Sequence, residues 1–152
     1  MQEKGLPLVS IVMNCYNGEL YLRDAIDSIY AQTYQNWEVI FWDNFSTDNT
    51  AKIAKSYDDR LKYFKSDKTT PLGEARSLAL KEAKGDYLSF LDCDDCLFPN
   101  KLKIQVEILE KNPSIYLLFS SYDVIDARGI LKRDFYVSDN NSVNFCSIIK
   151  SY

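Results

Sequence analysis

The residues best suited to chemistry are three carboxylates that follow a short apolar run. Residues 87–91 are mostly apolar, follow a turn signal at Gly85 and are too few for a helix, so they predict a buried strand. Asp92, Asp94 and Asp95 come directly after it. Three like charges this close repel one another, and a cation would relieve the repulsion. Because hard carboxylate oxygens suit Mg²⁺ or Mn²⁺ and these ions hold substrate phosphates, the motif predicts a divalent-metal site. The alternative is a solvated acidic loop that caps the next helix.

Polar side chains also follow two earlier apolar runs. Residues 8–13 are nearly all apolar or β-branched, which is typical of a parallel strand covered on both faces, and residues 37–42 repeat the pattern. In open α/β sheets, ligands bind at the carboxyl ends of the strands, so we expect these segments to converge with the acidic motif. The side chains concerned are Asn14, Tyr16 and Asn17 after the first run, and Asp43 and Asn44 after the second.

Helical segments separate these strands. The spacing of apolar residues predicts four helices and a short additional strand. The helices are expected at residues 20–31, 46–57, 73–83 and 98–112, and the strand at 61–64. Ser46 or Thr47 is expected to cap the second helix. The alternation predicts an α/β fold: a Rossmann-like single domain whose mixed, mostly parallel sheet carries helices on both faces.

The pattern weakens toward the end of the sequence. A strand is expected at residues 116–125, and residues 130–137 are expected to return as the second strand of a hairpin. Residues 138–152 are rich in Ser and Asn around one apolar cluster, so they form a weakly specified tail. The predicted organisation is one domain over residues 1–137, followed by this tail.

Composition narrows the function. At 152 residues the chain can bury a real core, and its net charge of −4 argues against a nucleic-acid binder. The absence of histidine removes every His-based triad and His metal ligand. Cys93 and Cys96 form a C-x-x-C, but the acidic residues between them disfavour thiolate chemistry, and zinc would need further ligands. With no signal peptide or spanning segment in the sequence, the expected location is the cytoplasm, including the inner face of the membrane.

The assembled motifs resemble the nucleotide-sugar-binding half of a family 2 glycosyltransferase with the GT-A fold. Each motif is short, but all four occur in the family's order and at the expected strand ends. They are residues 9–17 (VSIVMNCYN), 39–50 (VIFWDNFSTDNT), 73–76 (GEAR) and 90–95 (FLDCDD). The resemblance covers residues 8–126.

The resemblance implies roles for individual residues. Tyr16 would stack on the base, and Asp43 or Asn44 would meet the base edge. Many relatives carry two acids at this pair, so the Asp-Asn pair leaves the base identity open, and an Asx turn is the alternative role. Arg76 would bind the diphosphate through its guanidinium fork, with an exposed surface ion pair as the alternative. The remaining implied contacts are nucleotide binding by Asn14, Asn17 and Asp94, and metal binding by Asp92, Asp94 and Asp95.

The implied reaction is attack by an acceptor hydroxyl on the anomeric carbon of a nucleotide sugar, with inversion and loss of the nucleoside diphosphate. The expected donor is a UDP-linked sugar. A divalent metal would neutralise charge on the leaving diphosphate. In the family the general base is usually an acid in a later segment on the acceptor side, and Asp134 and Asp139 are poor candidates for it. The chain is therefore expected to be a donor-binding part without the acceptor half. An exposed apolar surface there would favour self-association. The family also suggests polysaccharide or glycolipid synthesis and peripheral membrane association.

Two other functions remain open. A non-catalytic nucleotide-binding or interaction module would keep the fold and lose the chemistry. A nucleotidyltransferase also uses a parallel sheet, a metal and a nucleotide, but its first loop is usually rich in Gly and basic residues. Residues 14–18 contain one Gly and no Lys or Arg, which ranks this class last.

Overall fold

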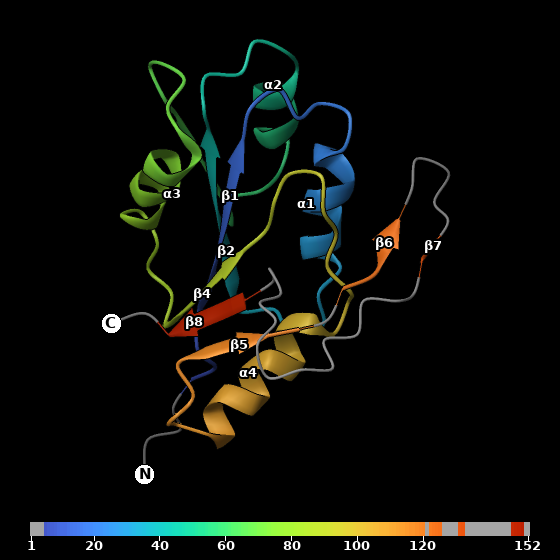
Figure 1. Ribbon diagram of the computed structural model, residues 1–152, viewed down its shortest axis with the longest axis vertical. Coiled ribbons are helices and arrows are strands. Elements are labelled where there is room, and N and C mark those ends of the chain that lie inside the picture. The colour runs from blue at the N-terminus through green and yellow to red at the C-terminus, as the bar shows by residue number, and fades with distance from the viewer. Residues whose placement is uncertain (1–4, 121, 126–130, 133–146, 151–152) are drawn as a thin grey trace.

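The protein is described by a computed structural model that covers residues 5–120, 122–125, 131–132 and 147–150. A six-stranded sheet in the order β3-β2-β1-β4-β8-β5 forms its centre (Figure 1). The strands of this sheet are β1 (Val9–Cys15), β2 (Trp37–Asp43), β3 (Leu61–Lys65), β4 (Tyr87–Phe90), β5 (Leu117–Phe119) and β8 (Ser147–Lys150). The helices are α1 (Leu22–Tyr30), α2 (Thr50–Ala54), α3 (Leu72–Leu80) and α4 (Lys101–Lys111).

The first four strands run parallel. β1 pairs with β2 on one side and β4 on the other, and β2 pairs with β3. Every residue of β1 is buried, which explains why its sequence is a continuous apolar run rather than an alternating one. The carboxyl ends of β1 and β2 lie at the top of the sheet in Figure 1. The predicted α/β class and parallel core are confirmed.

Helices cover both faces of the sheet. Alternate residues of β1, including Ile11 and Met13, pack into a cluster with buried residues of α1, α2 and α4. The intervening Val12 packs on the opposite face of the sheet, against Ile40 of β2 and Ala79 of α3. Each fully buried aliphatic side chain contributes about 1.5–3 kcal/mol relative to exposure, so these two layers hold the strand ends in fixed positions.

A buried carboxylate joins three strands near the amino-terminal end of the sheet. The hydroxyl of Ser10 donates to Glu38 Oε1 at 2.6 Å, and the Lys84 amide donates to the same oxygen at 2.8 Å. Lys62 donates to Glu38 Oε2. Burial acts to raise the pKa of Glu38, but these hydrogen bonds outweigh it and hold the pKa below its usual range. The turn before β4 is thereby fixed to β1, because Gly85 N also donates to Ser10 Oγ at 2.8 Å.

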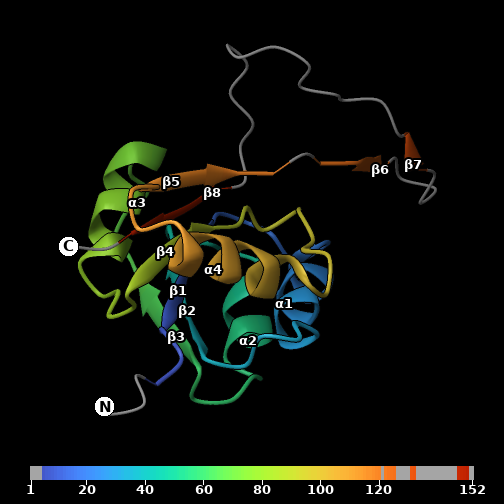
Figure 2. The ribbon, with the colours of Figure 1, turned by 90° about the horizontal axis from the view of Figure 1, so that it is seen from below.

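The carboxyl-terminal third differs from the sequence prediction. The single strand expected at 116–125 is two elements, β5 and β6 (Val124–Ile125), and β6 pairs with β7 (Leu131–Lys132) in a separate two-stranded sheet. β8 lies within the expected tail and inserts antiparallel between β4 and β5 (Figure 2). Only four residues of β8 are paired, so its signal in the sequence is weaker than that of the long buried strands. The proposed boundary after residue 137 stays a prediction.

Candidate functional site

The acidic segment begins at Asp92, which is separated from the end of β4 by one residue, Leu91. Leu91 N donates to Val12 O at 3.1 Å and extends the pairing with β1, after which the chain turns, with Asp95 N donating to Asp92 O at 3.2 Å. Leu91 and Leu97 are buried at the two ends of this turn, whereas the aspartates between them are exposed. The fold therefore anchors the segment and presents its carboxylates to solvent at the carboxyl edge of the sheet.

One of the three carboxylates is neutralised by an arginine. Arg76 Nη2 on α3 donates to Asp92 Oδ1 at 2.7 Å, and its guanidinium lies 5.8 Å from the ring centroid of Phe90. The structure thus brings Arg76 of α3 to the acidic segment through a solvent-accessible ion pair, which is the alternative role that the sequence analysis gave for this residue. Asp92 Oδ1 is thus used in this ion pair.

The other two carboxylates remain available to a ligand. Among the described residues, the side chains of Asp94 and Asp95 make no hydrogen bond or ion pair. Restricted hydration, together with the charges of Asp94 and Asp92, raises the pKa of the Asp95 carboxyl. No group of three Asp, Glu, Cys or His side chains in the described part of the chain is arranged to hold a metal by itself. A cation here would need further oxygens, which a diphosphate could supply.

The loop after β1 carries an exposed aromatic residue. Tyr16 is 53% exposed and lies between two residues that are tied to the loop after β2. Asn44 N donates to Cys15 O at 2.8 Å, and Asn17 N donates to Ser46 Oγ at 3.0 Å. The ring of Tyr16 is therefore presented at the carboxyl edge by a braced loop, where a flat ligand could stack on it.

Asn17 itself braces that loop. Its backbone has φ = 53°, a left-handed conformation that Asn tolerates, and its Oδ1 accepts from Thr47 N at 2.9 Å. This bond and the one from Asn17 N to Ser46 Oγ use the two residues that the sequence suggested as caps. The capping prediction is wrong for this reason: α2 begins only at Thr50, and its N-cap Asn49 makes no side-chain cap bond.

Asp43 and Asn44 are both buried and hydrogen-bonded. Asp43 Oδ1 accepts from Ser46 N, three residues further along the chain, at 2.7 Å, and Oδ2 accepts from the Tyr63 hydroxyl. The first bond holds the turn after β2, but it is not the bond to the second following residue that defines the Asx turn considered as an alternative role. Burial and the bond to Asp43 raise the pKa of Tyr63. Asn44 Oδ1 accepts from Thr70 N at 3.0 Å and its Nδ2 donates to Thr70 O at 2.8 Å. The side chains of Asp43 and Asn44 thus hold neighbouring loops together.

Asn14 lies beneath the site with unsatisfied polar atoms. It is 9% exposed, and neither its Oδ1 nor its Nδ2 has a partner among the described residues. Its cross-strand neighbour Trp42 also has a buried indole N–H without a partner there. Buried polar groups are nearly always hydrogen-bonded, so this pair is suited to bind an ordered water.

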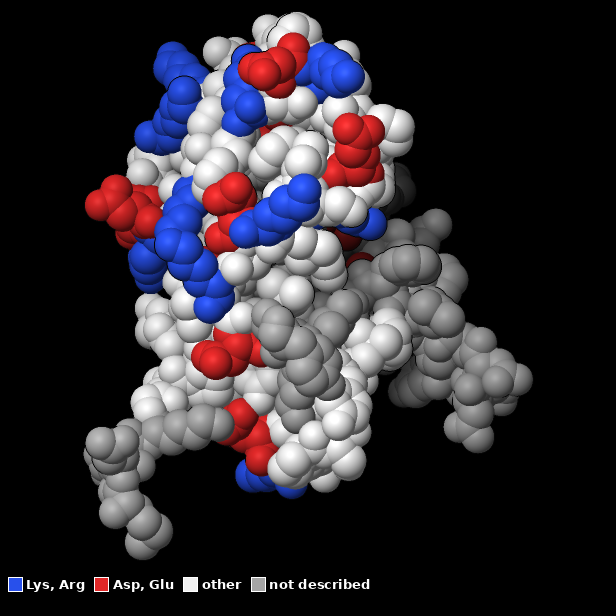
Figure 3. Space-filling model, turned by 90° about the vertical axis from the view of Figure 1, so that its left-hand side faces the viewer, with Lys and Arg blue, Asp and Glu red and all other residues white. Residues whose placement is uncertain are grey.

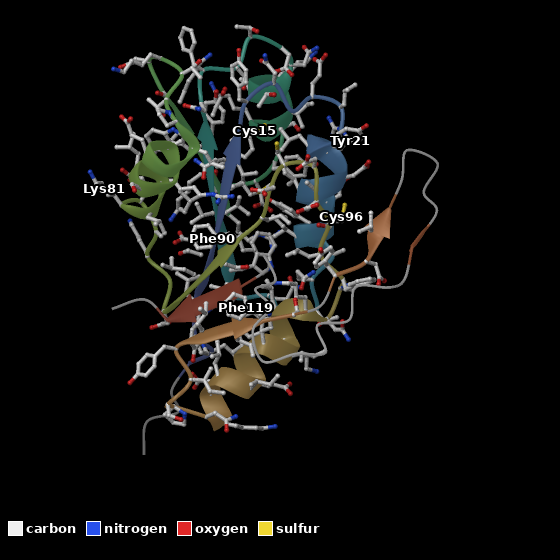
Figure 4. The ribbon with its side chains drawn as sticks, viewed as in Figure 1. Cys15, Tyr21, Lys81, Phe90, Cys96 and Phe119 are labelled. Atoms are coloured by element: carbon white, nitrogen blue, oxygen red, sulfur yellow. The ribbon has the colours of Figure 1, made fainter. Side chains whose placement is uncertain are left out.

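Two cysteines meet where the first loop approaches the acidic segment. A Cβ built on Gly18 would lie 2.4 Å from Cys15 Sγ and 3.2 Å from Cys93 Sγ, so both thiols adjoin the glycine. Cys15 lies high on β1 beside α1 in Figure 4, and both thiols are free. The hydrogen bond with Cys93 and burial raise the pKa of the Cys15 thiol. The sequence pointed to Cys96 as the neighbour of Cys93 and gave no sign of this contact.

Phe45 is a second exposed aromatic residue at this edge, and the sequence analysis did not single it out. It is 42% exposed and has φ = 72°. Holding an ordinary L-residue in this left-handed conformation costs about 1 kcal/mol. A bulky aromatic residue inside a run of Asn, Ser, Thr and Asp was the available signal, because such turns favour Gly or Asn.

The surrounding surface has no single sign of charge. Figure 3 shows Lys and Arg side chains intermixed with Asp and Glu on the face that carries α3. Such a mixture lacks the basic stripe typical of nucleic-acid binders. Across the described ranges, no helix combines the length and the hydropathy needed to cross a membrane.

Comparison with known proteins identifies the family. The sequence model of glycosyl transferase family 2 matches residues 10–145. An uncharacterized glycosyltransferase of Rickettsia typhi is 42% identical over 125 residues, covering 81% of this chain and 39% of the relative. The Escherichia coli UDP-Glc:alpha-D-GlcNAc-diphosphoundecaprenol beta-1,3-glucosyltransferase is 38% identical over 125 residues, covering 82% of this chain and 49% of that enzyme.

Solved structures confirm the GT-A fold. S. aureus TarS 1-349 in complex with UDP-GlcNAc matches with a TM-score of 0.81 at 24% identity, over 93% of this chain and 45% of that chain. A Pyrobaculum calidifontis mannosyltransferase in complex with GDP-Man and Mn²⁺ matches with a TM-score of 0.67 at 25% identity, over 73% of this chain and 34% of that enzyme. The chain spans less than half the length of these relatives. It belongs to glycosyl transferase family 2.

Proposed function

We propose that this chain binds a nucleotide-sugar donor, UDP-linked, together with Mn²⁺ or Mg²⁺, and that it forms the donor-binding part of an inverting glycosyltransferase. The observations that carry the proposal are the ion pair between Arg76 of α3 and Asp92 of the acidic segment, and the contact of Gly18, in the loop that carries Tyr16, with Cys93 of the same segment. The relative named as acting on UDP-Glc and the neighbour in complex with UDP-GlcNAc support this donor class.

The proposed contacts divide along the donor. Tyr16 stacks on the base, which is worth about 1–3 kcal/mol for an aromatic ring. Arg76 binds diphosphate oxygens through its guanidinium fork after exchanging its bond with Asp92. Asn14 and Asn17 lie beneath and beside the base, and Asp43 or Asn44 reaches the base edge only after one of its loop-holding bonds is released.

The acidic segment suits a divalent cation bound jointly with phosphate. Mg²⁺ is usually held by one or two carboxylates together with substrate oxygens rather than by a cage of protein ligands. Asp94 and Asp95 would be those carboxylates, with Asp92 next to them and paired with Arg76. When bound, the metal neutralises charge on the leaving diphosphate. The neighbour in complex with GDP-Man and Mn²⁺ supports the choice of ion.

Transfer also needs an acceptor hydroxyl and a general base. Asp134 and Asp139 lie outside the described residues, and the chain spans less than half of its relatives' length. We therefore propose that residues 1–137 bind the donor, and we assign no described residue to acceptor binding. The E. coli relative is named as acting on alpha-D-GlcNAc-diphosphoundecaprenol, which makes a lipid-linked sugar the acceptor to test first.

Calorimetry with UDP and Mn²⁺ tests the proposal. We expect the wild-type chain to bind UDP only when Mn²⁺ is present, and Asp95→Asn to abolish this binding while retaining the far-UV circular dichroism of the fold. Glu107→Gln on α4 is a matched control that also removes one acidic charge. Equal affinity of wild type and Asp95→Asn would remove Asp95 from the metal site, and binding without donor hydrolysis or transfer would favour a non-catalytic module.

A further inference from the structure

Phe45 and Tyr16 lie opposite each other on two adjacent loops. The hydrogen bond from Asn44 N to Cys15 O joins the residues just before them, and the bond from Asn17 N to Ser46 Oγ joins the residues just after them. Both aromatic side chains lie between these two bonds and both are exposed, Tyr16 by 53% and Phe45 by 42%. The loops thus present two aromatic rings at the edge of the sheet where the donor is proposed to bind.

The backbone of Phe45 indicates that its ring is retained for a reason other than folding. Its φ of 72° lies in the region that favours Gly, and a bulky residue there is a true outlier. Glycine would adopt the same turn without strain. Among the described residues, the only ring contact of Phe45 is with the Lys65 ammonium, 5.7 Å from the ring centroid. Strained residues that gain so little from packing are concentrated at ligand sites.

We propose that Phe45 is a base-contacting residue whose ring supplies a second aromatic surface for the nucleobase, next to Tyr16. This rests on the proposed donor-binding function. Stacking depends on the flat face that every base has, so the contact adds affinity for the nucleoside part of the donor and none for the diphosphate. The strained turn is the cost of placing a ring where the loop geometry alone would favour Gly.

Substitutions that separate the ring from the backbone test this proposal. Phe45→Leu keeps a bulky apolar side chain in the strained turn but lacks the ring, Phe45→Trp keeps a ring, and Phe45→Gly removes both the ring and the strain. Phe119→Leu is the matched control, because Phe119 is 43% exposed and lies on β5, the end strand on the β4 side of the sheet, whereas Phe45 follows β2 on the other side of β1 (Figure 4).

The affinities for UDP and for inorganic pyrophosphate, each with Mn²⁺, are measured by calorimetry. We expect Phe45→Leu and Phe45→Gly to bind UDP about tenfold more weakly, equivalent to about 1.4 kcal/mol, with pyrophosphate affinity unchanged. Phe45→Trp should stay within about threefold of wild type for UDP. Phe119→Leu should bind both ligands as the wild type does, and Phe45→Gly should melt within a few degrees of wild type because Gly suits the turn.

Two results would overturn the role of Phe45 alone. One is a wild-type chain that binds UDP while Phe45→Leu and Phe45→Gly bind it equally well. The other is a parallel loss of UDP and pyrophosphate affinity in these variants, which would mean that Phe45 only shapes the loop. A wild-type chain that binds neither UDP nor GDP would instead contradict the donor-binding function, and the role of Phe45 with it.

Discussion

Replacing Arg76 should weaken UDP binding strongly while changing the stability of the fold only slightly. Its side chain is 33% exposed, and that of its partner Asp92 is 56% exposed. An ion pair so accessible to solvent is worth at most about 1 kcal/mol, so Arg76→Met should lower the melting temperature by less than about 4 °C. A guanidinium that binds phosphate through charge-assisted hydrogen bonds contributes about 1.5–3 kcal/mol. We therefore expect UDP affinity to fall roughly 10- to 100-fold.

Arg60 provides the matched control for this variant. It is 38% exposed, pairs with Asp58 at 3.0 Å, and places its guanidinium 4.2 Å from the Trp37 ring centroid and 4.6 Å from that of Tyr30. Arg60→Met loses these cation–π contacts, each worth about 0.5–1 kcal/mol, and should lower the melting temperature more than Arg76→Met does. Because Arg60 precedes β3, at the amino-terminal edge of the sheet, its loss should leave UDP affinity unchanged.

Thermal unfolding and calorimetry with UDP and Mn²⁺, applied to both variants, give the two readouts. Arg76→Lys should show an intermediate loss of affinity, because an ammonium keeps the charge but cannot bind two oxygens through a planar fork. If Arg76→Met binds UDP within twofold of wild type, the guanidinium does not contact the diphosphate. If Arg60→Met loses as much affinity as Arg76→Met, the effect reflects general destabilisation.

Three further predictions concern the framework around the site. Gly85→Ala should cost about 2–3 kcal/mol in urea unfolding, because the added Cβ would lie 2.5 Å from the backbone N of Ser10; unchanged stability would contradict this packing. Glu38→Gln should cost about 2 kcal/mol at pH 7 through the lost ion pair with Lys62. Since the pKa of Glu38 is lowered in the folded state, this cost should shrink as the pH falls below about 4, and a cost independent of pH would refute the assignment. Asn44→Ala should lower the free energy of unfolding by about 2 kcal/mol, measured by thermal unfolding, because it loses two hydrogen bonds to Thr70 in the loop after β3. A variant as stable as the wild type would mean that these bonds do not stabilise the fold.

The central sheet was predictable because burial leaves a strong pattern. β1 and β2 are covered on both faces, so their sequences are continuous apolar runs, and the polar residues that follow them mark the strand ends. Parallel pairing then brings distant loops to one edge. The family resemblance assigned Arg76 to the diphosphate and Asp92 to the metal, and it did not predict the ion pair that joins them. The short β8 carries only four paired residues and could not be predicted as part of the sheet.

Details of the site depended on choices that spacing does not determine. Asp, Asn, Ser and Thr after a strand can bind a ligand or bind the neighbouring backbone, and both roles require the same residue types. Asp43, Asn44 and Asn17 make the second kind of bond. The contact between Cys15 and Cys93 and the left-handed turn at Phe45 arise from the way separate loops meet.

A crystal of this protein soaked with UDP and Mn²⁺ tests the central claim most directly, because anomalous scattering locates the metal independently of the nucleotide. The proposal predicts one Mn²⁺ peak between the carboxylates of Asp94 or Asp95 and the diphosphate, with the uracil ring against Tyr16. A manganese peak away from the acidic segment, or a nucleotide bound on another face of the protein, would contradict it.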